Sequence, residues 1–271
     1  MHGSHHGGVR QRWTVAAAAA GLLISLAPMA RAAVDPHATI SVTCPSSPCA
    51  TSLIATAIAG ATAGDTIQVV AGTYLGTLSI SKSIAIEAAT PGAVTLDGQK
   101  AAGQEITIGA GLEVVLDGLT ITGGTANSGP GAGIFNNGST VIVAESTISA
   151  NGEDSAFAGG GIANDGSMLV TGSTITANQA GGGSGIFNDG SLELTNSTIF
   201  GNLAPGWSGG GIANPGTLIA RNATINGNSA YAGGGIWSSG TATLINTIVA
   251  GNTATSKPDL GATSATGPRA T

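Results

Sequence analysis

Two aspartates hold equivalent places before glycine and are the first candidates for metal chemistry. Asp165 lies in NDG at 164–166, and Asp189 lies in NDG at 188–190, 24 residues later. If the chain repeats with that period, the two carboxylates lie about 5 Å apart. They would then either bind a cation such as Ca²⁺ together, or one carboxyl would have its pKa raised by the charge of the other. Asp-Gly is also a common turn pair. Because the sequence places no third ligand, a turn is the preferred interpretation and a Ca²⁺ site the alternative.

Aromatic residues recur at two fixed distances from a repeated isoleucine. Three stand five residues before it, and three follow it directly. These six are Phe157, Trp207 and Tyr231, and then Phe135, Phe187 and Trp237. If the isoleucine points inward on a strand, the residue after it points outward. Packing beneath loops is the simpler interpretation of these rings, and binding of a polysaccharide or cell-surface glycan is the functional hypothesis.

Residues 1–32 have the layout of a signal peptide. Arg10 and Arg12 precede the apolar run VAAAAAGLLISLA, and ARA at 30–32 supplies the small residues that a signal peptidase reads. The run is shorter than the ~20 residues of a membrane-spanning helix, so cleavage after Ala32 is preferred over a membrane anchor. The mature protein is expected to be secreted and to have no membrane span.

Loss of this leader makes the chain more acidic. Five Lys and Arg remain against fourteen Asp and Glu, a formal net charge of −9. A basic face that neutralises phosphates is therefore excluded, which argues against nucleic acid as a partner. Acidic polysaccharides are poor partners for the same reason.

Cys44 and Cys49, in CPSSPC, are the two cysteines of the chain. An exported protein with one close pair of cysteines is expected to join them in a disulfide. A zinc site would need further Cys or His ligands nearby.

The elements that position these residues follow from internal repetition. The isoleucines of Thr-Ile pairs recur every 23–28 residues, and so do the isoleucines that follow glycine runs. The first set is Ile121, Ile148, Ile175, Ile199, Ile225 and Ile248, and the second is Ile134, Ile162, Ile186, Ile212 and Ile236. Two independent sets with one period indicate a solenoid.

Within each repeat the apolar residues alternate, as in strands with one buried face. An alternating pair such as Val141 and Val143, a Thr-Ile strand and a Gly-Ile strand give three short strands per coil. The last coil, with Ala242 and Leu244, fits after a one-residue deletion. The predicted fold is all-β, a right-handed parallel β-helix of about eight coils with a short N-terminal cap helix. At the bend after the Thr-Ile strand, asparagines are expected to stack from coil to coil: Asn151, Asn178, Asn202, Asn228 and, one position later, Asn252.

From GDTIQVVAGTYLGTLSISKSIAIEAA at 64–89, through VVLDGLTITGG, to the GGGIAN coils, the chain resembles secreted bacterial right-handed β-helix proteins of the pectate-lyase-like superfamily. The resemblance covers residues 40–255. It implies that residues 51–64 form a cap helix over the first coil, and the apolar face of this segment agrees: Leu53, Ile54, Ala57, Ile58 and Ala61.

Catalytic motifs of that superfamily do not match this sequence. The Gly-His-Gly and Arg-x-Lys motifs of galacturonan hydrolases do not occur, and the mature Lys and Arg residues are scattered. Pectate lyases combine acidic Ca²⁺ ligands with an Arg or Lys base, and pectin esterases pair Asp with Arg. No complete constellation of either kind is found, so no catalytic residue and no cofactor, Ca²⁺ apart, is assigned.

The sequence predicts four segments. These are a signal peptide at 1–32, a disulfide loop and cap helix at 33–64, the β-helix at 65–255 and a disordered tail at 256–271. The preferred function is a secreted, non-catalytic module that binds a cell surface or matrix. A polysaccharide lyase or hydrolase of the superfamily is the first alternative, and a truncated or degenerate scaffold is the second. An uncapped C-terminal end predicts self-association.

Overall fold

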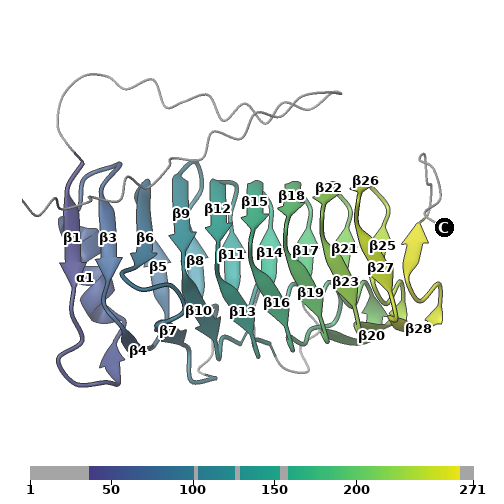
Figure 1. Cartoon of the computed structure of the whole chain (residues 1–271), viewed down its shortest axis with the longest axis horizontal. Helices are drawn as coiled ribbons and strands as arrows, with labels where there is room; N and C mark the ends of the chain where they lie inside the picture. Colours follow the sequence, from purple (N-terminus) through teal and green to yellow (C-terminus); the bar gives the residue numbers. More distant parts are fainter. Residues whose placement is uncertain (1–36, 101–102, 126–128, 153–157, 263–271) are drawn as a thin grey trace, which may run out of the picture. The chain divides into compact units, whose positions relative to one another are not determined.

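The computed structural model describes residues 37–100, 103–125, 129–152 and 158–262. These residues form a parallel β-solenoid of about eight coils with three strands per coil and one short helix (Figure 1). The predicted fold class is confirmed, and the architecture is consistent with right-handed winding. The predicted signal peptide lies outside the described residues. Within the described part of the chain, no helix combines the length and apolar character needed to cross a membrane.

Two nine-stranded parallel sheets, here called sheets A and B, run the length of the solenoid. Sheet A contains β1 (Thr39–Val42), β3 (Thr66–Val69), β6 (Ile84–Ala88), β9 (Glu113–Asp117), β12 (Thr140–Ala144), β15 (Ser167–Thr171), β18 (Ser191–Thr195), β22 (Thr217–Arg221) and β26 (Thr241–Ile245). Sheet B contains β2 (Cys49–Ala50), β4 (Gly72–Leu75), β7 (Val94–Asp97), β10 (Leu119–Thr122), β13 (Thr147–Ser149), β16 (Thr174–Thr176), β19 (Thr198–Phe200), β23 (Thr224–Asn226) and β27 (Ile248–Ala250).

A third sheet, sheet C, carries the Gly-Ile strands. In the last coils a strand of a small fourth sheet precedes each strand of sheet C in the sequence. Sheet C contains β5 (Leu78–Ile80), β8 (Ile106–Ile108), β11 (Ile134–Asn136), β14 (Ile162–Asn164), β17 (Ile186–Asn188), β21 (Ile212–Asn214), β25 (Ile236–Ser238) and β29 (Leu260–Ala262). The fourth sheet contains β20 (Leu203–Ser208), β24 (Ser229–Ala232) and β28 (Thr253–Ser256).

The core is a set of aliphatic columns, as the alternation predicts. Ile134, Ile162, Ile186, Ile212 and Ile236 pair in register along sheet C and are fully buried. Matching columns on sheets A and B, such as Val141 to Met168 and Ile148 to Ile175, face them across the interior. Because each coil repeats the same inward residues, every strand buries its apolar side against the coils before and after it.

The predicted asparagine stack is a hydrogen-bonded ladder. In each step the Nδ2 group of one asparagine donates to the Oδ1 atom of the next, at 2.9–3.1 Å. The ladder contains Asn151, Asn178, Asn202, Asn228 and Asn252. Each Nδ2 group also donates to a strand carbonyl, as Asn178 does to Ile148 at 3.0 Å. These bonds satisfy polar groups that the bend turns away from water.

A second ladder of the same kind crosses the bend between sheets C and A. Asn136 donates to Asn164, Asn164 to Asn188, Asn188 to Asn214 and Asn214 to Ser238, at 2.7–2.9 Å. Asn164 and Asn188, which belong to this ladder, directly precede Asp165 and Asp189 in the NDG bends and were not predicted as a stack. The recurring Asn two places before glycine was the signal.

The last coil is in register without a deletion. Ala242 pairs with Leu218, Leu244 with Ala220 and Val249 with Ile225. The prediction that Ile248 occupies the isoleucine column is therefore wrong by one residue, and its side chain is 60% exposed. A uniform 24-residue spacing keeps Val249 facing inward and keeps Asn252 in the ladder.

The cap helix α1 (Ser52–Gly60) covers the first coil and packs against β1, β3 and β5. Ile54 and Ile58 are buried, and so is Ala61, which follows the helix. Leu53, predicted to share this apolar face, is instead 40% exposed. The helix is nine residues long rather than fourteen, and the residues that it buries are Ile54 and Ile58.

Strand pairing extends beyond the predicted 65–255 segment at both ends. β1 pairs with β3, which places Thr39–Val42 in sheet A. β29 pairs with β25, so Leu260–Ala262 belongs to sheet C and not to a disordered tail. The final coil leaves Ile245, Ile248 and Leu260 exposed. Self-association through this end stays a prediction.

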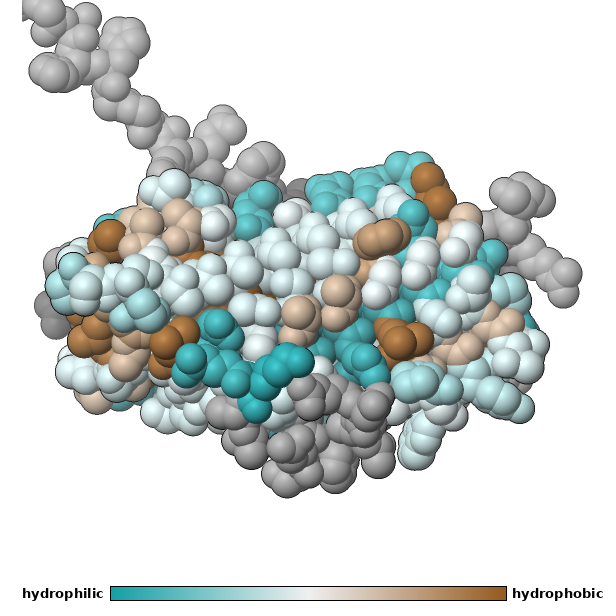
Figure 2. All heavy atoms as spheres, turned by 90° about the horizontal axis from the view of Figure 1, so that it is seen from below, coloured by the Kyte–Doolittle hydropathy of each residue, from teal (hydrophilic) through white to brown (hydrophobic). Residues whose placement is uncertain are grey.

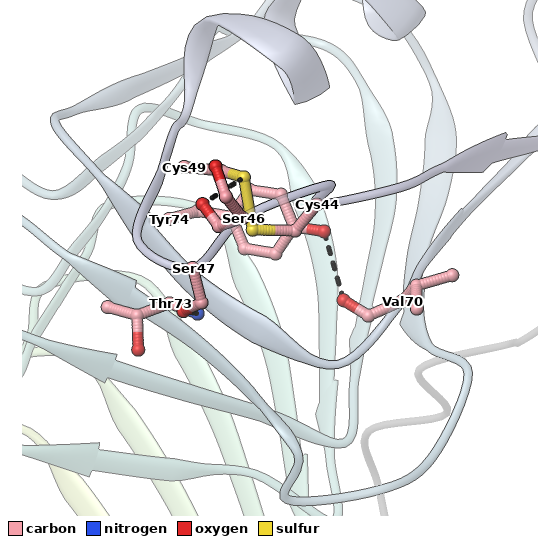
Figure 3. The surroundings of a disulfide bond; sticks show 7 residues. All are labelled: Cys44, Ser46, Ser47, Cys49, Val70, Thr73 and Tyr74. Atoms are coloured by element: carbon pink, nitrogen blue, oxygen red, sulfur yellow. Dashed lines mark hydrogen bonds between the residues drawn. A yellow bond between two sulfur atoms is a disulfide. The ribbon is translucent and has the colours of Figure 1, made fainter.

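The predicted disulfide between Cys44 and Cys49 is confirmed (Figure 3), with a Cα–Cα distance of 5.7 Å. It closes the loop between β1 and β2. Beside it Tyr74, fully buried, donates its hydroxyl to the Val70 carbonyl at 2.9 Å. The loop is thereby fixed to the first coil next to the cap helix.

Candidate functional site

Hydrophobic residues on the face shown in Figure 2 form separate small groups among the described residues, rather than one continuous patch. Aromatic side chains converge on one hollow in the surface of the described residues. Its volume is about 420 Å³. The described residues that line it are Ala158, Gly182, Phe187, Gly206, Trp207, Ser208, Ala213, Pro215, Tyr231, Trp237 and Ser239. We call this hollow the aromatic groove.

The floor of the aromatic groove is the outer face of sheet C. Each residue that follows the buried isoleucine points outward, because side chains alternate along a strand. In register these residues are Phe135, Ala163, Phe187, Ala213, Trp237 and Gly261. Phe187, Ala213 and Trp237 form the floor of the groove.

One wall of the groove comes from the fourth sheet. β20 and β24 pair in parallel, with a register shift between Ala204 and Ser208. Trp207 lies within this irregular stretch and is 62% exposed, and Tyr231 on β24 is 59% exposed. Large aromatic side chains with this exposure lose apolar contacts that a buried position would give them. The opposite margin is formed by Pro215 and Ser239, at the bend that leads to sheet A.

Trp237 lies at the C-terminal end of the floor. A Cβ atom on Gly261 would come within 2.5 Å of the Trp237 ring, so only glycine leaves room for the indole in the next coil. The Lys257 ammonium lies 5.5 Å from the centroid of the same ring, within the range of a cation–π contact. Lys257 thus marks the point where the apolar floor ends.

The structure brings four of the six predicted aromatics together. Phe187, Trp207, Tyr231 and Trp237 line one groove. Phe135 lies in the same outward column, two coils earlier, and is not part of the lining. Phe157 lies outside the described residues.

Asp165 and Asp189 are neighbours at the bend between sheets C and A, and both are exposed. Partial shielding from water and, after it, the negative charge of Asp189 raise the pKa of the Asp165 carboxyl. Pro215 and Ser239 occupy the same bend in the following coils, so the pair lies in line with one margin of the aromatic groove. No group of three or more His, Cys, Asp or Glu that would hold a metal occurs among the described residues. Ca²⁺ binding by this pair stays a proposal.

Glu105 is a buried acid that the sequence analysis missed. Its side chain has no exposed surface, and neither carboxyl oxygen has a hydrogen-bond partner among the described residues. Burial, and to a lesser degree the charge of Asp97, raises the pKa of Glu105 to about 8. The signal lay in the register: the next five coils carry Gly133, Gly161, Gly185, Gly211 and Gly235 at this position.

A glycine neighbour makes room for this carboxyl. A Cβ atom on Gly98 would come within 2.5 Å of Oε2 of Glu105. Gly124, one coil before Asn151, donates its amide to the Oδ1 atom of Asn151 at 3.0 Å and itself has no side chain. A Cβ atom on Gly124 would also come within 3.0 Å of the Glu105 backbone nitrogen, so Glu105 lies near the place where the first asparagine ladder stops. It is not among the residues that line the aromatic groove.

Comparison with known proteins supports the architecture and nothing more specific. No protein-family model matches the sequence, and no curated protein sequence resembles it. Among solved structures, the deglycosylated pectin methylesterase from Aspergillus niger is similar, with a TM-score of 0.52 and 14% sequence identity. The match covers 87% of this chain and 93% of the esterase. At this identity the similarity shows a shared fold.

Proposed function

We propose that this protein is an exported, non-catalytic β-helix that binds polysaccharide in the aromatic groove. The observation that carries the proposal is the exposure of Trp207 and Tyr231 beside Phe187 and Trp237 in one hollow. The flat, apolar face of an aromatic ring can pack against the C–H face of a sugar. Aromatic side chains have few rotatable bonds, so the entropic cost of binding is low. The rigid solenoid holds these rings in fixed positions before the ligand arrives.

The chemistry of the lining favours binding over catalysis. The described lining residues include no carboxylate, histidine, lysine or arginine. General acid–base catalysis needs such a group within hydrogen-bond reach of the reacting atom. The hydroxyls of Tyr231, Ser208 and Ser239 can donate and accept hydrogen bonds with a sugar. The groove therefore has the composition of a binding site.

Export is supported by two features. The leader-like sequence at 1–32 has the layout of a signal peptide. The disulfide between Cys44 and Cys49 is typical of an oxidising compartment.

The test is retention of the mature protein on a glycan array and on insoluble polysaccharides. Replacement of Trp207 and Tyr231 by alanine is expected to abolish retention on every glycan that binds the parent protein. Phe200→Ala is the matched control, because Phe200 is 49% exposed on sheet B and is not part of the lining. Equal retention of the double variant and the parent would refute the proposal.

An enzyme that acts on pectin is the alternative, favoured by the structural similarity to a pectin methylesterase. Methanol release from methylated pectin and formation of unsaturated products, each measured with and without Ca²⁺, test esterase and lyase activity. Turnover that survives substitution of Trp207 and Tyr231 would place a reaction outside the aromatic groove.

A further inference from the structure

The outward column of sheet C, which supplies the floor of the aromatic groove, alternates between large and small residues with a period of two coils. Phe135, Phe187 and Trp237 are separated by Ala163 and Ala213, and Gly261 follows. Neighbouring strands in a sheet lie about 4.8 Å apart, so consecutive rings on the floor are about 10 Å apart along the stacking direction. A ligand that fits this floor must present the same feature at every second step.

The groove also has a direction. Its two margins are the fourth sheet, with Trp207 and Tyr231, and the bend with Pro215 and Ser239. Both margins follow successive coils, so the groove crosses the strands of sheet C and runs along the stacking direction. A linear chain lying in it meets Phe187, then Ala213 with Trp207 at its side, and then Trp237.

The charge of the lining restricts the ligand further. None of the described lining residues carries a charged side chain, and the mature chain has an excess of acidic residues. A polyanion entering this groove would meet the Lys257 ammonium at the C-terminal end, 5.5 Å from the Trp237 ring centroid, and along the rest of the described lining it would lose hydration without gaining an ion pair. A neutral chain loses only the smaller hydration energy of its hydroxyl groups and gains apolar contacts.

We infer that the aromatic groove binds a neutral, extended β-1,4-linked glycan along the stacking direction, one sugar per coil. In such a chain each sugar advances by roughly one strand spacing, ~5 Å. Successive sugars are turned over relative to one another, so the same ring face recurs at every second sugar. One sugar stacks on Phe187, the next lies over Ala213 beside Trp207, and the third stacks on Trp237. This inference rests on the proposed function.

The experiment compares oligosaccharides of defined linkage and length by calorimetry, with the mature protein. Cellohexaose is expected to bind at least tenfold more tightly than maltohexaose, whose α-1,4 links curve the chain away from a straight floor. Between cellobiose and cellotriose the affinity is expected to rise about tenfold, because the third sugar reaches the second floor ring. Hexagalacturonate, the anionic comparison, is expected to bind more weakly than cellohexaose.

Variants assign the binding to the floor. Phe187→Ala and Trp237→Ala are each expected to weaken cellohexaose binding about tenfold, as for loss of one stacking contact. Phe200→Ala is expected to leave the affinity within about twofold. Phe187→Leu, which keeps apolar volume but not the flat ring, is the second variant if Phe187→Ala fails to fold, and the same weakening is expected.

The outcomes separate this inference from the proposed function. If maltohexaose or hexagalacturonate binds as tightly as cellohexaose, or if affinity stops rising at two sugars, the assignment of linkage and register is overturned. If cellohexaose does not bind but another glycan is lost on substitution of Trp207, the linkage is wrong and the proposed function stands. If no glycan binds, both are refuted.

Discussion

Glu105 is the residue with the most unusual surroundings outside the aromatic groove. A carboxyl without a hydrogen-bond partner in the interior avoids the cost of a buried charge by staying protonated. Its pKa of about 8, against an ordinary value of 4.5, reflects burial first and the charge of Asp97 second. At neutral pH the folded protein therefore holds Glu105 mainly as a neutral acid.

Replacement of Glu105 by glutamine is expected to change how stability depends on pH. Because the pKa is raised on folding, the stabilising effect of the protonated form is complete below about 4.5 and is lost as the pH rises to about 8. The melting temperature of the parent should fall across this window, relative to Glu105→Gln, whose amide does not ionise. Thermal unfolding at pH 5, 7 and 9 measures the difference. Parallel curves for the two proteins would show that Glu105 ionises equally in both states.

At the scale of elements, the asparagine ladders add side-chain hydrogen bonds between coils to the backbone bonds at the bends, such as that from the Gln179 amide to the Asn151 carbonyl at 2.9 Å. Asn178 illustrates the density of these bonds. Its Nδ2 group donates to Ile148 and Asn202, and its Oδ1 atom accepts from the backbone amide and the Nδ2 group of Asn151. Truncation of this side chain leaves several buried polar groups without partners.

Asn178→Ala is expected to lower the free energy of unfolding by about 3 kcal/mol, since each buried polar group left unpaired costs about 1–3 kcal/mol. Urea unfolding followed by circular dichroism gives the value. Asn246→Ala is the matched control: Asn246 also donates to an asparagine one coil away, Asn222, but this bond is exposed. A loss of about 1 kcal/mol is expected there, and it comes mainly from the left-handed backbone of Asn246 (φ +47°), which alanine adopts less readily than asparagine. A comparable loss in both variants would mean that burial does not determine the strength of the ladder.

At the scale of the whole molecule, each coil of the solenoid is stabilised by its neighbours, so the two ends have the fewest contacts. The N-terminal end is covered by α1 and fixed by the disulfide between Cys44 and Cys49. The C-terminal coil ends with β28 and β29, and exposes Ile248 and Leu260. The two ends are therefore protected in different ways.

Replacement of Cys44 and Cys49 by serine is expected to lower the free energy of unfolding by about 2 kcal/mol, the value for a loop this short in the chain-entropy model. Hydrogen exchange should show the loss mainly in α1 and β1, because contacts in a solenoid are local. Addition of reductant to the parent is the chemical control and should give the same loss. Exchange that increases uniformly to β26 would instead indicate that the solenoid unfolds as one unit.

The columns that repeat were predictable and the exceptions were not. Ile162 and Ile186 occupy the interior as the alternation indicates, because one-residue shifts would expose every apolar side chain of a strand. Ile248 was misplaced because its own strand permits two registers, and only the neighbours Leu244 and Asn252 select one. Leu53 was misplaced because a periodic pattern indicates the face of a helix and not how much of it is covered.

The sequence by itself determined the solenoid, its period, its inward columns, the disulfide and the first asparagine ladder, because each of these follows from residues repeated in register. Only the tertiary structure decided which aromatics meet. Phe187 and Trp237 come from sheet C, while Trp207 and Tyr231 come from the fourth sheet, which the repeat does not predict. The distance between these side chains depends on how β20 bulges and packs beside sheet C, and that follows from contacts between coils rather than from any local pattern.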